Sequence, residues 1–201
     1  MKKYYLLLLL FGIGLLLSAI EPHDYFTWFL EVFPALLGVM VLLATFEKFR
    51  FTYFVYVLIL LHTYILFIGG HYTYAEVPLF DSIRDALGQE RNNYDKIGHF
   101  MQGFVPAAIT REIFIRRKII NSKSWLPFLV ICVCVWISAM YEFLEWGIAL
   151  ATGSNADAFL GTQGYVWDTQ SDMLYAAIGS VVFILLFSRI HNKKIQKELG
   201  E

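Results

Sequence analysis

The sequence predicts an all-α protein: a polytopic membrane bundle of about six transmembrane helices, folded as a single integral membrane domain over residues 1–201. Composition is the first reason. Of the 201 residues, 58% are hydrophobic and 16% are charged, whereas soluble domains are about 45–50% apolar and about 25% charged. The mean hydropathy of +0.56 agrees. A small soluble domain leaves much of its surface in water, so it cannot hide this much apolar surface.

The second reason is the length of the apolar runs. A helix needs about 20 apolar residues to cross about 30 Å of hydrocarbon, and six stretches qualify or nearly qualify. They are Tyr4–Ile20, Tyr25–Phe46, Phe51–Gly70, Asp95–Ile115, Ser124–Ala151 and Asp168–Ile190. Strands of membrane barrels alternate apolar and polar residues. These runs do not alternate, so we expect helices.

The third reason is the distribution of Lys and Arg, which are enriched in cytoplasmic loops. With the N-terminus placed in the cytoplasm, thirteen of the 16 basic residues fall inside. The outside segments hold only Arg84, Arg91 and Lys96. Six spans put both termini on the same side of the membrane. Charge and span count therefore agree in predicting cytoplasmic N- and C-termini.

The N-terminus has one alternative interpretation. Lys2 and Lys3, followed by an apolar run and then Ser18-Ala19, resemble a secretory signal peptide. The run is long for a signal peptide and no clean cleavage site follows it. We therefore expect an uncleaved first helix. Cleavage would leave five spans and an external N-terminus.

The two longer outside loops differ from the short, basic inside loops. The loop His71–Tyr94 is expected to carry a short amphipathic segment near Leu79–Leu87 that lies on the membrane surface. The loop Thr152–Trp167 contains several glycines. Both loops lie at the side of the membrane where the polar residues described below are expected.

Composition also excludes some classes of protein. The net charge is −1 and no basic face runs through an aqueous domain, so a nucleic-acid partner is excluded. Two cysteines provide no disulfide framework. The expected partner is the lipid bilayer, together with a lipid or cell-envelope substrate if the protein is an enzyme. The oligomeric state is not predicted.

Three of the predicted helices carry polar residues on one face. The sets are Asp95, His99, Gln102, Pro106 and Thr110 in the fourth helix, Ser138, Glu142, Glu145 and Thr152 in the fifth, and Asp168, Asp172, Tyr175 and Gly179 in the sixth. Residues spaced three or four apart share a helix face. The simplest packing turns the three faces toward one another and away from lipid.

These acids and histidines are also predicted to lie at one depth, in the outer half of the bundle. Glu31, near the start of the second helix, and His71, at the end of the third, fall at the same level. Ionisable groups in a bilayer cost about 2.5–3.5 kcal/mol each on insertion scales and usually mark function or a buried pair. We therefore predict a functional site in which His99, Glu142 and Asp172 lie in one cavity, within about 10 Å of one another.

Residue chemistry suggests the roles at this site. The candidate catalytic residues are His99, Glu142, Glu145, Asp95 and Asp172, and the candidate metal ligands are His71, His99, Glu142, Glu145, Asp168 and Asp172. Histidine titrates near neutral pH and serves as base or ligand. Carboxylates on facing helices bind divalent ions or divide into acid and base. The cofactor is unknown, and a divalent metal ion is the candidate.

Each residue alone also has a structural explanation. Asp95 and Asp168 fall in first helical turns, where a carboxylate favours the positive end of the helix dipole by about 0.3–1 kcal/mol. Glu142 and Glu145 are able to join a structural hydrogen-bond network with Gln102 and Tyr175. The functional interpretation rests on the set, because five carboxylates and two histidines at one depth exceed what packing needs.

Several motifs resemble those of the YjdF family of bacterial inner-membrane proteins. They are Tyr94-Asp95-Lys96-Ile97-Gly98-His99-Phe100, Gln102-Gly103-Phe104-Val105-Pro106, Arg111-Glu112, Tyr141-Glu142-Phe143-Leu144-Glu145-Trp146, Phe159-Leu160-Gly161-Thr162-Gln163-Gly164, Trp167-Asp168-Thr169-Gln170 and Asp172-Met173. The resemblance covers essentially the whole chain. It implies a bacterial inner (plasma) membrane location and multi-pass topology, but no activity, because the family is a domain of unknown function. The stretch from Asp95 to Phe100 also resembles VanZ-type membrane proteins, over one helix only, which implies a role in the cell envelope.

Three classes of function remain open from the sequence. The first is an intramembrane enzyme that acts at the outer face on a lipid or envelope substrate. The second is a proton- or ion-coupled transporter of small solutes, since intramembrane ionisable groups form ion sites. One-sided clustering of the acids and the lack of an inverted repeat weigh against it. The third is a structural or accessory membrane protein whose polar cluster only fixes helix packing.

The topology is directly testable. We expect a reporter that works only in the cytoplasm to be active when it is fused after Glu201, because the basic residues concentrate on the cytoplasmic side of the predicted topology. A matched fusion in the loop His71–Tyr94 should give the opposite result. A C-terminal fusion active only in the periplasm would contradict the predicted topology.

Overall fold

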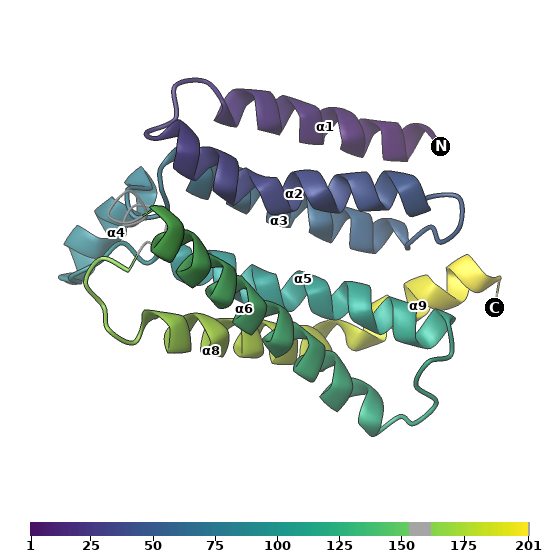
Figure 1. The fold of residues 1–201 in the computed structure, drawn as a ribbon. Coiled ribbons are helices and arrows are strands. Elements are labelled where there is room, and N and C mark those ends of the chain that lie inside the picture. The colour runs from purple at the N-terminus through teal and green to yellow at the C-terminus, as the bar shows by residue number, and fades with distance from the viewer. Residues whose placement is uncertain (153–161, 201) are drawn as a thin grey trace.

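A computed structural model describes residues 1–152 and 162–200 and is helical throughout its regular structure. The elements are α1 (Lys2–Ser18), α2 (Tyr25–Thr45), α3 (Tyr53–His71), α4 (Pro78–Leu87), α5 (Tyr94–Arg116), α6 (Trp125–Thr152), α8 (Asp168–Val182), the π-helical segment η2 (Phe183–Phe187) and α9 (Ser188–Leu199). The predicted all-α membrane bundle is confirmed (Figure 1). The central part of the predicted loop Thr152–Trp167, residues 153–161, lies outside the described residues.

Within the described ranges, four helical stretches are long and apolar enough to cross a membrane: α2, α3, α6 and the continuous run from Asp168 to Leu199. α1 has 17 residues, and α5 has a much lower mean hydropathy than α2, α3 and α6. The count of six spans therefore stays a prediction. Both chain termini lie at one end of the bundle, opposite α4 (Figure 1). We refer to these as the terminal end and the α4 end.

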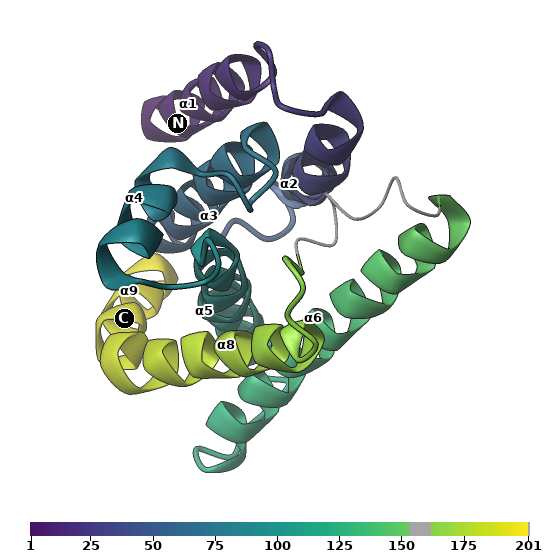
Figure 2. The same ribbon diagram turned by 90° about the vertical axis from the view of Figure 1, so that its left-hand side faces the viewer.

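The low hydropathy of α5 is explained by its central position. α5 packs against α3, α6 and α8, while α2 and α1 are each packed on the far side, against α3. Figure 2 shows α5 surrounded in this way, with α6 crossing α8 obliquely. More residues of α5 are buried than of any other described helix. Its polar side chains therefore face protein and not lipid, which is the usual arrangement for ionisable residues at membrane depth.

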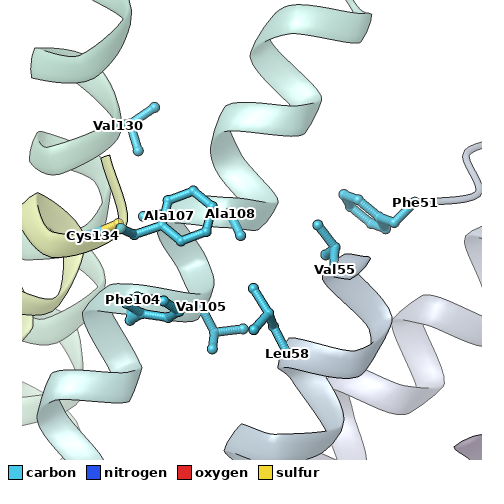
Figure 3. Packing of buried hydrophobic residues seen from close by; sticks show 10 residues of the cluster. Phe51, Val55, Leu58, Phe104, Val105, Ala107, Ala108, Val130 and Cys134 are labelled. Atoms are coloured by element: carbon cyan, nitrogen blue, oxygen red, sulfur yellow. The ribbon is translucent and has the colours of Figure 1, made fainter. Parts of the chain in front are cut away.

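Apolar packing joins the middle of the bundle. Phe51, Val55 and Leu58 at the start of α3 face Val105 and Ala108 of α5 (Figure 3). On the other side of α5 the same core continues to the remaining members, Phe104, Ala107, Val130, Cys134 and Phe183. This core lies between the two polar ends of α5. It holds the helix at a fixed rotation about its own axis, and that rotation decides which polar residues meet.

The closest backbone approach in the bundle is between α5 and α8. A Cβ added at Gly103 would overlap the backbone carbonyl of Ala176, and one added at Gly179 would overlap the carbonyl of Phe100. Small residues at helix crossings let membrane helices approach closely. These two glycines therefore set the separation between the helices that carry most of the acids.

Gly103→Ala should separate α5 from α8 and destabilise the bundle, because overpacking a tight contact costs about 1–3 kcal/mol. Thermal unfolding in detergent measures the effect. Gly147→Ala on α6 is the matched control, since an added Cβ there meets no atom within 4 Å. Equal unfolding temperatures for the two variants would show that the close approach is not needed.

Candidate metal centre and cavity

The polar residues at the α4 end come from the first three turns of α5, the outer part of α6 and the start of α8. Lys96 is the cation at their centre and is 6% exposed. Its ammonium donates to Asp168 Oδ1 at 2.8 Å and to Asp172 Oδ1 at 2.5 Å, and it lies 3.3 Å from Asp95 Oδ2. All three aspartates are themselves buried. One buried cation thus ties α5 to α8.

Arg91, in the segment before α5, adds a second cation to this network. Its guanidinium donates to Asp168 Oδ1 at 2.5 Å and lies 3.5 Å from Asp95 Oδ2. Lys96 therefore contacts Oδ2 of Asp95 and Oδ1 of Asp172, and Arg91 also contacts Oδ2 of Asp95. Hydrogen bonds from such neighbours orient a carboxylate and leave its second oxygen to face elsewhere.

The second oxygens face His99. Its Nε2 lies 3.2 Å from Asp95 Oδ1 and 3.8 Å from Asp172 Oδ2. On the other side of the ring, Nδ1 lies 3.1 Å from the amide oxygen of Gln102, to which it is placed to donate. A histidine that donates through Nδ1 presents its Nε2 lone pair, the arrangement in which imidazole binds a metal ion.

Asp95, His99 and Asp172 are therefore a candidate metal centre. One ligand atom from each residue lies within 4.8 Å of the others. Two carboxylates and one imidazole suit zinc, manganese or ferrous iron. Three protein ligands leave positions open for water or substrate, which is typical of catalytic sites and not of structural ones.

Glu142 of α6 is the nearest further acid. Its Oε1 lies 3.9 Å from His99 Nδ1, outside hydrogen-bonding distance. Among residues 1–152 and 162–200, this buried atom has no hydrogen-bond partner, and the residue is only 6% exposed. Because a buried polar atom without a partner costs about 1–3 kcal/mol, this oxygen of Glu142 is available to a water, a ligand or the carboxyl's own proton.

A cavity of about 190 Å³ adjoins the candidate metal centre. Its wall includes Asp95 and His99 of the centre, and further ionisable side chains face it from α2, α3 and α6: Glu31, His62, Tyr141 and Glu145. The Tyr141 hydroxyl donates to Glu31 Oε2 at 3.4 Å across the cavity wall. The candidate metal centre therefore has a chamber on one side whose wall carries several ionisable groups but is mostly apolar, with residues such as Leu66 and Ile137.

Tyr74, in the turn after α3, covers part of this cavity. Its ring lies so close to Gly69 of α3 and Gly98 of α5 that a Cβ at either glycine would overlap it. Burial raises the pKa of the Tyr74 hydroxyl well above its ordinary value. The hydroxyl therefore stays neutral and can donate a hydrogen bond toward the cavity.

A loop contact closes the α4 end. The side-chain amide of Gln163 accepts from the backbone N–H of Asn92 and donates to its carbonyl, both at 2.9 Å. The side chain of Asn92 in turn donates to Val77 O and to Asp81 of α4, each at 3.0 Å. α4 occupies the place predicted for the amphipathic segment, and these bonds fasten it beside the start of α5.

His99 lies 3.9 Å from Glu142 and 3.8 Å from Asp172, so the three side chains lie close together as predicted. They do not share one cavity, because His99 alone of the three lines the described cavity. Asp95 belongs to the candidate metal centre, and Asp168 belongs to the ion pairs beside it. Glu145 lines the adjoining cavity. His71 does not join them: its Nδ1 is bonded to the Ser18 carbonyl at 3.0 Å, at the α1–α2 connection. Its predicted part in a metal site is therefore not supported by the geometry.

One other expectation needs correction. Tyr175 shares the predicted inward face of the sixth span, but it is 38% exposed, and Ala176 faces α5 in its place. Lys96, which the charge distribution assigns to an outside segment, is in addition a buried cation of the site, a role that the sequence analysis did not give it. A signal for it was present, because Lys96, His99 and Gly103 are spaced three and four apart and so share a helix face.

A second polar cluster lies at the terminal end of α5. Glu112 is fully buried and accepts from His191 Nε2 at 3.0 Å, from Arg116 at 2.7 Å and from Thr52 at 2.8 Å. Every oxygen of this carboxylate is thus satisfied. The cluster fixes α9 to α5 and serves as an internal comparison for the less satisfied site at the α4 end.

Fold and site together define a multi-pass α-helical membrane protein with a buried acid–histidine centre. The family model described as "Predicted membrane protein (DUF2238)" matches residues 3–193, and the chain belongs to this family. The chain is 46% identical over 183 residues to the "Inner membrane protein YjdF" of Escherichia coli (strain K12), covering 91% of this chain and 88% of that relative. The YjdF resemblance of the sequence motifs is confirmed. No solved structure gives a significant match.

Lys96→Met should destabilise the bundle strongly, because it leaves Asp172 buried without its cation and leaves Asp168 with Arg91 alone, and breaking a buried pair costs about 3–5 kcal/mol. Unfolding in detergent measures the loss. Lys123→Met is the control, since Lys123 is exposed. Adding Asp172→Asn to Lys96→Met should restore part of the stability, and a further loss in the double variant would contradict the pairing.

Proposed function

We propose that this protein is a metal-dependent enzyme of the bacterial inner membrane that acts on a lipid or cell-envelope substrate. The observation that carries the proposal is the convergence of Asp95, His99 and Asp172 beside a cavity whose wall carries several ionisable groups. In this proposal the termini are cytoplasmic and the α4 end faces the periplasm. The positive-inside distribution of Lys and Arg supports that orientation.

The reaction class follows from the residues around the centre. A divalent ion held by two carboxylates and an imidazole polarises a phosphoryl or carbonyl oxygen, or activates a bound water. Glu145 and Glu31 face the same cavity and are placed to move a proton. Metal-assisted hydrolysis or group transfer at an ester or phosphoester is therefore the chemistry that these side chains support.

The position of the cavity supports a membrane-derived substrate. Its wall is formed by α2, α3, α5 and α6, and the side chains that flank it on α2 and α6 are large, apolar and exposed, including Phe33, Leu37, Met140 and Leu144. Exposed apolar residues on a membrane bundle face acyl chains. A substrate with a polar head in the cavity and apolar chains in the bilayer fits this arrangement.

An ion-coupled transporter is the second candidate. It is favoured by one observation: Glu31, Asp95 and Glu145 face the cavity together with His62 and His99, and such groups form ion and proton pathways in membranes. Reconstituted vesicles separate the two functions. Pyranine-reported proton movement across the vesicle membrane supports transport, whereas metal content without such movement supports the enzyme.

The metal content of the purified protein is the direct test of the proposed metal centre. Protein purified without chelators and loaded with Zn²⁺ or Mn²⁺ should retain about one equivalent, as expected for a three-ligand site, and His99→Ala should lose it. His191→Ala is the matched control, because it removes a buried, carboxylate-paired histidine from the same bundle. Elemental analysis gives the readout. Absence of metal from the wild type after loading, or equal loss in both variants, rejects the metal centre.

Glu142→Gln and Glu145→Gln separate chemistry from packing. A glutamine keeps the shape and hydrogen-bonding capacity of the acid but removes the anionic ligand and proton acceptor. We expect both variants to insert and fold near normally, because removing a buried charge relieves its desolvation. At least one should fail to complement the phenotype of a deletion. Full complementation by both would favour the structural role, with Glu112→Gln as the control for a satisfied buried acid.

A further inference from the structure

A second cavity lies away from the acid–histidine centre, between α1 and α2. Its volume is about 280 Å³. α1 and α2 form its two walls and α3 forms its floor, because each of the two helices packs on α3 and not along the other. The lining residues are Met1, Tyr4, Tyr5, Leu7, Leu8, Phe11, Val39, Leu42, Leu43, Phe46, Glu47, Tyr56, Ile59, Leu60 and Thr63. We call this cavity the α1–α2 trough.

The length of the α1–α2 trough corresponds to one leaflet of a bilayer. Along α1 its lining runs from Met1 to Phe11, and ten residue steps at about 1.5 Å per residue span about 15 Å. The hydrocarbon core of a bilayer is about 30 Å thick. The trough therefore begins at the terminal end and reaches the middle of the membrane.

The walls of the trough are apolar and open to the bilayer. Tyr5 is 63% exposed, Leu8 is 40% exposed and Leu43 is 57% exposed. Phe11 closes the deep end by packing against Phe67 of α3, with ring centroids 5.3 Å apart. Such a lining accepts a hydrocarbon chain and offers a polar ligand very little.

The mouth of the trough is cationic. Lys3 and Arg50 lie against aromatic rings of the lining there, and Glu47 is the acid in the lining. Lys3 Nζ lies 4.9 Å from the Tyr53 ring centre and 5.1 Å from that of Tyr4. The Arg50 guanidinium lies 4.4 Å from the Phe46 ring centre and 3.6 Å from Glu47. Aromatic rings thus hold two cations beside the opening of an apolar channel.

We propose that the α1–α2 trough binds a phospholipid with an anionic headgroup, from the leaflet at the terminal end. One acyl chain lies in the trough and the phosphate contacts Lys3 and Arg50. Length, lining and charge each fit this ligand, and a headgroup without net charge would leave the cationic mouth unmatched. The site is independent of the metal centre, so it stands whether or not the proposed enzymatic function does.

Native mass spectrometry of the full chain, released from mixed micelles with equal phosphatidylglycerol and phosphatidylcholine of identical acyl chains, tests the proposal. Wild type should retain phosphatidylglycerol in preference. Lys3→Ala and Arg50→Ala should each weaken that preference about fivefold, the equivalent of about 1 kcal/mol per basic residue at an anionic surface. Lys118→Ala and Lys123→Ala are matched controls, since both are exposed cations in the α5–α6 connection.

A second variant tests the channel itself. Leu8→Trp fills the trough from a half-exposed position and should reduce retention of both lipids without lowering the unfolding temperature. Equal retention of the two lipids by wild type overturns the proposal, as does unchanged retention in Leu8→Trp. If Lys3→Ala or Arg50→Ala lowers the unfolding temperature, the comparison is made with Leu8→Trp.

Discussion

The ammonium group of Lys96 is buried among three carboxylates, and the α4 end of the bundle is arranged around it. Taking a charge out of water costs several kcal/mol, and only close, well-oriented partners recover that cost. Asp168 and Asp172, on α8, and Asp95, on the same helix as Lys96, are the carboxylates that offset this desolvation cost. The glycines at the α5–α8 crossing make this possible, because they let the two backbones come within reach of a single side chain.

The ion pairs of Lys96 and Arg91 also determine what His99 meets. Lys96 contacts Oδ2 of Asp95 and Oδ1 of Asp172, and Arg91 contacts the same oxygen of Asp95. The other carboxylate oxygens, Oδ1 of Asp95 and Oδ2 of Asp172, lie nearest His99 Nε2. Those atoms are satisfied in one of two ways: by an imidazolium proton shared with the carboxylates, or by a divalent ion. The two occupants differ in composition, so elemental analysis decides between a structural and a chemical role.

Buried acids are treated differently at the two ends of the bundle. Glu112 of α5, at the terminal end, accepts from a histidine, an arginine and a threonine, and has no unused oxygen. Glu142 of α6, at the α4 end, keeps a buried oxygen that has no hydrogen-bond partner among the described residues. A network that only fixes packing is expected to be complete, since incomplete burial of polar atoms is costly. The incomplete network is the one that favours a function.

Much of this protein follows from its sequence alone. Apolar runs of about 20 residues require membrane helices, and spacing of three and four residues puts Asp95 with His99, and Asp168 with Asp172, on single faces. The depth at which these faces meet follows from helix direction, so the grouping of His99, Glu142 and Asp172 was predictable. The structure decided which neighbours each face meets. It added Lys96 and Arg91 to the ion pairs of the site, bonded His71 to the Ser18 carbonyl at the end of α1, and turned Tyr175 outward. Spacing fixes only the relative positions of residues on one helix. The rotation of each helix and its choice of neighbour are set by long-range contacts, here the apolar core around Phe104 and the glycine crossing of α5 with α8.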